Sequence, residues 1–149
     1  MSTTRITLER GICADPASTA LLLAGPTALE LWPGVRRVGD IGGRALVEAE
    51  LDSPPQGLAV AASVTAGAPR RTPTSFVTRF AWTGPELPVT AGVLTLTYVP
   101  GEGTPTTCAE LVLDVVGLEA SRVGDRELTR MAEVFLANLA RAAESRRAA

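Results

Sequence analysis

Residues 125–149 read DRELTRMAEVFLANLARAAESRRAA, and this stretch decides the fold. Its large apolar residues recur at helical spacing and fall on one stripe, which comprises Leu128, Met131, Ala132, Phe135, Leu136 and Leu139. Charged residues occupy the other side, and Asp125 can serve as the N-cap. The pattern predicts a long amphipathic helix whose apolar stripe must lie against a large apolar surface.

The rest of the chain offers a sheet as that surface. Several runs have the length and the residue types of strands, namely residues 4–12, 35–41, 44–51, 58–65, 74–82, 89–99 and 106–117. Gly42-Gly43 joins two of them and favours a tight hairpin with positive φ. From residue 35 onward the connections are too short for crossover helices, so this part of the sheet must be antiparallel.

Two short helical segments separate the first strand from the second. Asp15 can cap a helix that has Pro16 at its first position and continues over residues 17–23. Residues 27–31 can form one further turn, and Trp32-Pro33-Gly34 ends this region. Because the chain has no internal repeat and no linker, we expect residues 1–149 to form a single α+β domain with a seven-stranded antiparallel sheet.

The composition is that of a globular protein. Hydrophobic residues make up 46% of the 149 residues and charged residues 20%. No apolar stretch reaches the ~20 residues that span a bilayer, and no segment has the pattern of a secretory signal. We therefore expect a cytoplasmic protein that is not an integral membrane protein. The formal net charge of −2 gives no general attraction to nucleic acid.

The residues available for chemistry are few. The chain has no histidine, which removes most hydrolase and metalloenzyme mechanisms. Cys13 and Cys108 have no metal-ligand spacing, and in a cytosolic protein we expect both thiols to stay free. From the sequence we assign no catalytic residue, no metal site and no cofactor.

Several segments, taken in order, resemble the SRPBCC superfamily, which includes START domains, birch-pollen-allergen-like proteins and polyketide cyclase or dehydrase-like proteins. They are residues 14–17 (ADPA) between the first strand and a helix, residues 32–35 (WPGV) before the second strand, Gly42-Gly43-Arg44, and the helix from Asp125. The likeness covers essentially the whole chain. It implies a helix-grip fold, in which a curved sheet wraps around the last helix and leaves a cavity between them.

Residue size bears on that cavity in two ways. Only 4% of the residues are aromatic, and the strands carry many Ala, Thr and Val residues. A curved sheet lined with such side chains fills its interior incompletely and leaves room for a ligand. The alternative is that small residues let the helix pack closely against the sheet and leave little space.

Strand alternation and the helix stripe indicate which residues face the cavity. These are Trp32, Val60, Phe76, Phe80, Trp82, Leu94, Leu96, Tyr98, Leu111, Leu113, Met131 and Phe135. Core packing is the alternative role for each of them. Trp32 and Tyr98 combine a large apolar body with a polar tip that can orient a ligand, and Tyr98 is the only candidate phenolic acid or base. Alternation places Arg79 and Asp114 on the outer face, and we expect the same of Arg44.

Three functions are compatible with these features. The first is binding, transport or sequestration of a hydrophobic small molecule or lipid in the cavity. The second is an aromatase or cyclase in which enclosure folds a poly-β-keto chain, with acid–base help from Tyr98, a carboxylate or water. The third is a protein-interaction module without a small ligand. Either a monomer or a homodimer is compatible with the sequence.

Overall fold

The computed structural model describes residues 2–24, 28–50, 59–84, 87–100, 106–118 and 124–148, without the side chains of residues 59, 60, 87, 88, 147 and 148. The elements follow the order β1 (Thr3–Ile12), α1 (Pro16–Ala24), the 3₁₀ turn η1 (Ala28–Leu31), β2 (Val35–Ile41), β3 (Arg44–Glu50), β4 (Ala59–Ala66), β5 (Arg70–Arg71), β6 (Ser75–Gly84), β7 (Leu87–Val99), β8 (Thr106–Val116) and α2 (Asp125–Ala148). Leu51 and Leu58, which the sequence places at strand ends, lie outside the described residues.

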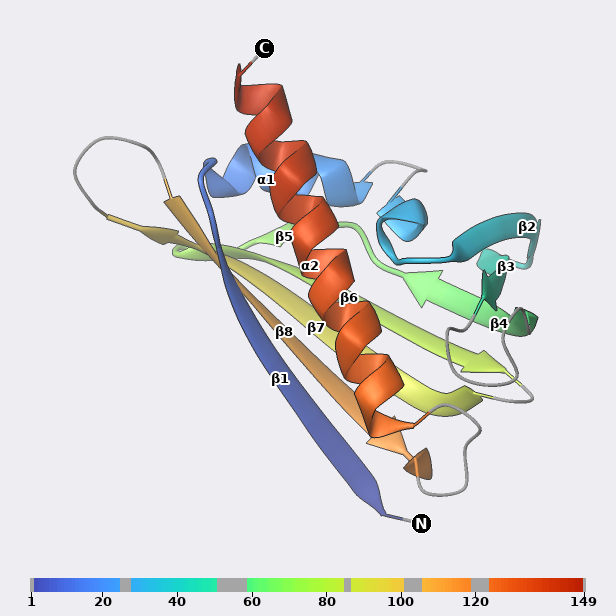
Figure 1. Ribbon diagram of the computed structural model, residues 1–149. Helices are drawn as coiled ribbons and strands as arrows, with labels where there is room; N and C mark the ends of the chain where they lie inside the picture. The colour runs from blue at the N-terminus through green and yellow to red at the C-terminus, as the bar shows by residue number, and fades with distance from the viewer. Residues whose placement is uncertain are drawn as a thin grey trace.

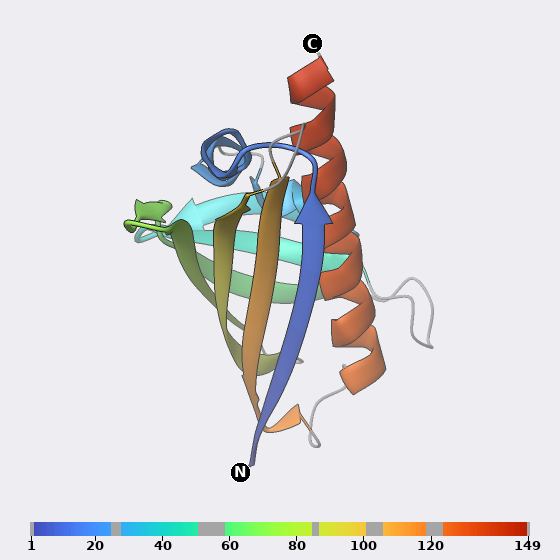
Figure 2. The same cartoon turned by 90° about the vertical axis from the view of Figure 1, so that its left-hand side faces the viewer.

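The strands form one antiparallel sheet that curves around α2. The order across the sheet is β1-β8-β7-β6-β4-β3-β2, and β5 pairs with β6 off this path. Figures 1 and 2 show α2 running along the concave side of the sheet, with α1 across one end. This arrangement confirms the predicted helix-grip fold.

The sheet differs from the prediction by one strand. The structure contains an eighth strand, β5, where the sequence indicates only a polar, turn-rich segment. Its two residues pair with the first half of β6, Arg70 with Val77 and Arg71 with Phe76. A strand of two exposed residues is too short to show alternation, so the sequence carries no signal for it.

The core forms where the α2 stripe meets the central strands. Burial alternates along β8, and Leu111 and Leu113 are completely buried. Leu94 and Leu96 of β7 lie on the same inner face and are 1% exposed. These residues and the predicted α2 stripe belong to one apolar cluster, so the stripe packs as predicted.

Three hydrogen bonds tie the helices to the end of the sheet. The backbone N–H of Cys13 donates to Oε2 of Glu144 over 2.9 Å. The side-chain amide of Asn138 donates to the carbonyl oxygen of Leu31 over 2.8 Å. The buried hydroxyl of Thr107 donates to the carbonyl oxygen of Ala14 over 2.6 Å. These bonds join the segment between β1 and η1 to α2 and β8, and so fix its position relative to the concave face.

The helix starts follow local capping rules, with one difference from the prediction. Oδ2 of Asp15 accepts from the Ser18 amide over 3.3 Å, which confirms Asp15 as the N-cap of α1. In α2 the Leu128 amide donates to the carbonyl oxygen of Gly124 over 3.1 Å. Gly124 is therefore the N-cap, and Asp125 occupies the first helical position, where a carboxylate still stabilises the helix dipole.

The outer face carries the charged residues that alternation assigns to it. Arg79 and Arg44 are exposed, and Asp114 forms an ion pair with Arg5 across β1 and β8, with Nε and Oδ1 2.8 Å apart. Gly42 and Gly43 adopt φ values of 56° and 79°, as the predicted hairpin requires. In the described part of the chain, no helix is both long and apolar enough to cross a membrane.

Candidate functional site

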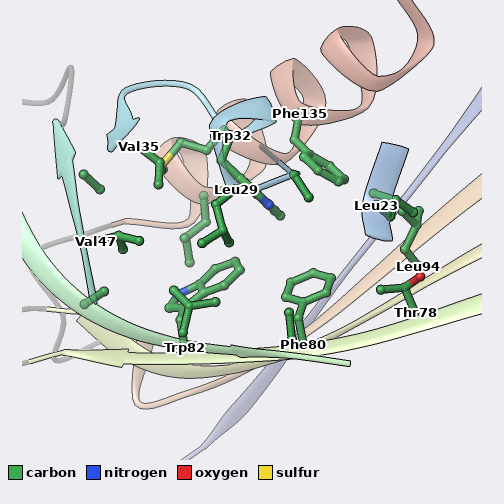
Figure 3. Close-up of a pocket in the computed structure, with 17 residues that line it drawn as sticks. Leu23, Leu29, Trp32, Val35, Val47, Thr78, Phe80, Trp82, Leu94 and Phe135 are labelled. Atoms are coloured by element: carbon green, nitrogen blue, oxygen red, sulfur yellow. The ribbon is translucent and has the colours of Figure 1, made fainter. Parts of the chain in front are cut away.

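A pocket with a cavity volume of about 90 Å³ opens between the concave face of the sheet, η1 and α2. The sheet contributes Val35, Val47, Ala49, Ala62, Val64, Ala66, Thr78, Phe80, Trp82 and Leu94 to its lining. The helices and their connections contribute Leu23, Ala28, Leu29, Trp32, Leu128, Met131 and Phe135. In Figure 3 Trp82 and Phe80 form one side, while Trp32 and Leu29 face them from the other.

The pocket lies on the β3, β4 and β6 side of the sheet because side chains there are small. Ala49 of β3 and Ala62 of β4 face inward and are almost completely buried. Toward β8, by contrast, the inner face carries Leu94 opposite Leu111. Large side chains therefore fill the interior on one side of β6, and small ones leave space on the other.

Four aromatic side chains of the lining are in contact with one another. Trp32 stacks on Phe135 with ring centroids 4.3 Å apart, and Phe80 stacks on Trp82 at 5.6 Å. Trp32 also meets both β6 rings edge to face, Phe80 at 5.9 Å and Trp82 at 5.1 Å. Trp32 thus joins the helix to the sheet, and each such pair contributes about 0.5–1.5 kcal/mol beyond burial.

Gly92 determines where the Phe80 ring lies. The two residues are directly opposite each other on β7 and β6, and Gly92 is buried. A Cβ at position 92 would lie 2.8 Å from Cε1 of Phe80 and closer still to Cζ and Cε2. The ring therefore occupies the space that any other residue at position 92 would fill.

The described lining residues carry no charge, and their polar side-chain groups are one hydroxyl and two indole N–H groups. Thr78 supplies the hydroxyl from the inner face of β6, and the residue is only 7% exposed. Trp32 and Trp82 supply the N–H groups, and they are the only two tryptophans of the chain. The pocket is therefore an apolar site with a few polar groups, a combination typical of small-molecule sites.

Two groups with a shifted pKa, Asp114 and Cys108, lie outside the pocket lining. Hydrogen bonding from Arg5, with the charge of its guanidinium, lowers the pKa of Asp114 on the outer face. Burial raises the pKa of the Cys108 thiol, and the charges of Glu9 and Glu110 add to this. Cys108 of β8 lies opposite Gly11, and Cys13 follows the end of β1; the two cysteines form no disulfide in the structure.

The structure separates the predicted cavity residues into several groups. Those that line the pocket are Trp32, Phe80, Trp82, Leu94, Met131 and Phe135. Leu96, Leu111 and Leu113 are buried in the core beside it, where the α2 stripe covers them. Val60 belongs to β4, but its side chain lies outside the described part of the structure.

Phe76 and Tyr98 lie away from the pocket. Phe76 is half-buried at the β5 end of β6, where it packs against the core. Tyr98 shares the inner face of β7 with Leu94 and Leu96, but it is 52% exposed. It lies one residue before the end of β7. The structure therefore places the phenol outside the pocket.

The sequence-based list lacks several residues that do line the pocket. Thr78 and Leu128 share a face with Phe80 and Met131, so alternation and helical spacing could have identified them. Leu23, Leu29 and Val35 come from α1, η1 and β2. No pattern in the sequence indicates that these three reach the pocket, because their position there depends on tertiary packing.

No family model and no curated protein matches this chain. Solved structures do match it, at sequence identities that show the fold alone. An aromatase/cyclase from Streptomyces sp. R1128 is 16% identical over 97% of this chain and 96% of its own, with a TM-score of 0.63. A norcoclaurine synthase from Thalictrum flavum, a point mutant bound to a transition-state analogue, is 11% identical over 98% and 97%, with a TM-score of 0.60.

A START superfamily protein from Mycobacterium smegmatis is 17% identical over 95% of both chains, with a TM-score of 0.54. The chain shares the helix-grip fold of these structures.

Proposed function

We propose that the protein binds a small hydrophobic molecule in the pocket beneath Trp32. The observation that supports this most is the lining itself, which combines aliphatic side chains with four aromatic rings and no charged group among the described residues. Burial of apolar ligand surface against such a lining favours binding by about 25 cal/mol per Å². The likeness to a START superfamily protein agrees with a ligand-binding role.

The size of the pocket narrows the kind of ligand. A cavity of about 150 Å³ lined by apolar side chains holds benzene, and small-molecule pockets commonly reach 300–1,000 Å³. At about 90 Å³ this pocket is smaller than the benzene cavity, so a single ring, or the end of a chain, enters only as lining side chains move apart. Leu23, Leu29 and Val35 are half-buried members of the lining. The ligand that fits best is therefore a neutral compound with a single ring, and a longer lipid would insert only its tip.

Tryptophan fluorescence tests this proposal directly, since both tryptophans line the pocket. The probes are p-xylene and 4-methylbenzoate, which have similar shapes and differ in charge. We expect p-xylene to change the emission saturably and 4-methylbenzoate to bind more than about tenfold more weakly, because a carboxylate would be buried without a partner.

A pair of variants on β4 distinguishes pocket binding from surface binding. Ala62→Leu fills the pocket, whereas Ala61→Leu adds the same atoms on the exposed outer face of the same strand. We expect the p-xylene response to be lost in Ala62→Leu and kept in Ala61→Leu, with far-UV circular dichroism confirming that both are folded. Equal binding by the two variants, or no saturable response in the unmodified protein, would contradict the proposal.

A further inference from the structure

We propose that Thr78 anchors the ligand through a single hydrogen bond, so that the pocket selects neutral ring compounds with one oxygen at one end. The inference rests on the proposed binding function and adds to it the ligand's polarity and orientation. Thr78 is the one described lining residue with a hydroxyl group. It is 93% buried, since only 7% of its surface is exposed.

The position of Thr78 follows from the register of β6. Thr78, Phe80 and Trp82 alternate onto the inner face, and Thr78 lies directly opposite Leu94 of β7. Figure 3 shows the threonine at the end of the pocket where Leu23 and Leu94 lie, with its hydroxyl oxygen next to Leu94. Trp82 and Val47 lie toward the other end in the same view. The pocket thus has one end with a hydroxyl and one end lined by apolar atoms.

The Thr78 hydroxyl makes no hydrogen bond to a residue of the described structure. Other inward threonines are satisfied within the protein; the Thr107 hydroxyl, for example, donates to the carbonyl oxygen of Ala14. Every side-chain oxygen of the described structure that is sealed from solvent has a hydrogen-bond partner, so the Thr78 oxygen, which has none, is not sealed, and Thr78 is one of the pocket-lining residues. An accessible hydroxyl in an otherwise apolar lining is a free hydrogen-bonding position for a ligand.

The chemistry of the surroundings limits what can occupy that position. Valine has nearly the same shape as threonine and would line the pocket without a polar atom to desolvate. A hydroxyl both donates and accepts, so it can bind a carbonyl, an ether or another hydroxyl. A carboxylate or an ammonium group would find no opposite charge in the described lining. The class that fits is therefore a neutral phenol, alcohol or ketone, with its oxygen at Thr78 and its ring toward Trp82.

Toluene and phenol test this, because they have almost the same shape and differ in one methyl-to-hydroxyl exchange. Their dissociation constants are measured by tryptophan fluorescence and by ligand-observed NMR, and the quantity compared is the toluene Kd divided by the phenol Kd. Four proteins are used: the unmodified chain, Thr78→Val, Thr78→Ser and Thr83→Val. Thr83 lies on the same strand but is exposed, so it is the matched control.

We expect the Kd ratio to fall about 2- to 12-fold in Thr78→Val. This is the fold-change in Kd that corresponds to the loss of one hydrogen bond. It should fall much less in Thr78→Ser, which keeps the hydroxyl, and stay unchanged in Thr83→Val. Toluene should bind Thr83→Val as it binds the unmodified chain, and Thr78→Val at least as tightly, because no hydroxyl is desolvated there.

The other outcomes overturn the inference in distinguishable ways. If both probes bind in a manner that Ala62→Leu abolishes, but the Kd ratio is unchanged in Thr78→Val, the pocket binds ligands without the Thr78 anchor. If neither probe binds any of the four proteins while circular dichroism shows them folded, the anchor and the binding function both fail.

Discussion

Replacing Gly92 with alanine is the sharpest perturbation of the pocket wall, because one added carbon displaces one ring. That carbon would lie 2.8 Å from Cε1 of Phe80 and closer to two other ring atoms, whereas carbon atoms in contact are about 3.5–4.0 Å apart. The ring must therefore retreat by at least about 1 Å. Because Phe80 stacks on Trp82 and meets Trp32 edge to face, the displacement passes to both tryptophans.

Two opposing effects determine how much Gly92→Ala changes the free energy of unfolding. Overpacking of a core costs about 1–3 kcal/mol, whereas alanine in a strand is more favourable than glycine by about 0.5–1 kcal/mol. The net expectation is that Gly92→Ala lowers the free energy of unfolding by up to about 2.5 kcal/mol. Urea unfolding followed by far-UV circular dichroism measures this without depending on the displaced indoles.

A double-mutant cycle with Phe80→Leu isolates the cause. Leucine has no ring over Gly92, so in this background the same glycine-to-alanine change should raise the free energy of unfolding by about 0.5–1 kcal/mol. The reasoning is refuted if Gly92→Ala is equally destabilising with and without the Phe80 ring.

Two further predictions concern titratable groups outside the pocket. Hydrogen bonding from Ser18 lowers the pKa of Asp15, the α1 N-cap, and burial opposes this. The Asp15 carboxylate therefore stabilises the fold above the pKa that it has in the unfolded chain. This contribution is lost as the pH falls through the lower pKa of the folded protein. Asp15→Asn keeps a capping side chain, and its urea stability should therefore fall less than that of the unmodified protein below about pH 4; an equal fall would count against the assignment. Burial raises the pKa of Cys108, whereas Cys13 is exposed, so iodoacetamide at neutral pH should modify Cys13 first by peptide mass spectrometry. Modification of both cysteines at the same rate would contradict the buried environment of Cys108.

The features that the sequence predicts well are those that depend on local periodicity. The Leu128-to-Leu139 stripe, the Gly42-Gly43 hairpin and the outward positions of Arg79 and Asp114 follow from helical spacing, turn chemistry and strand alternation. Each involves residues close together in the chain, and each agrees with the structure.

The position of the pocket along the sheet depends on long-range packing instead. Alternation places Leu94, Leu111 and Tyr98 on the same inner face, but it does not show where α2 crosses that face. The structure gives the three different surroundings: Leu94 borders the pocket, Leu111 is completely buried and Tyr98 is half exposed. The same limit explains why Leu29, which reaches the pocket from a turn, has no signal in the sequence.

Thr78 is an intermediate case. Its inward direction follows from the positions of Phe76 and Phe80, two residues away on either side, so its place on the inner face could be predicted. That its hydroxyl has no hydrogen-bond partner among the described residues depends on what packs around it, and only the structure shows this.

The most direct test of the central claim is a crystal structure of the protein grown with p-xylene. If the pocket beneath Trp32 is a ligand site, electron density for the ring should lie between Trp82 and Val47, with the aromatic cluster in its present arrangement. A structure at saturating p-xylene in which side chains fill this space, and the compound is absent from it, would contradict the account.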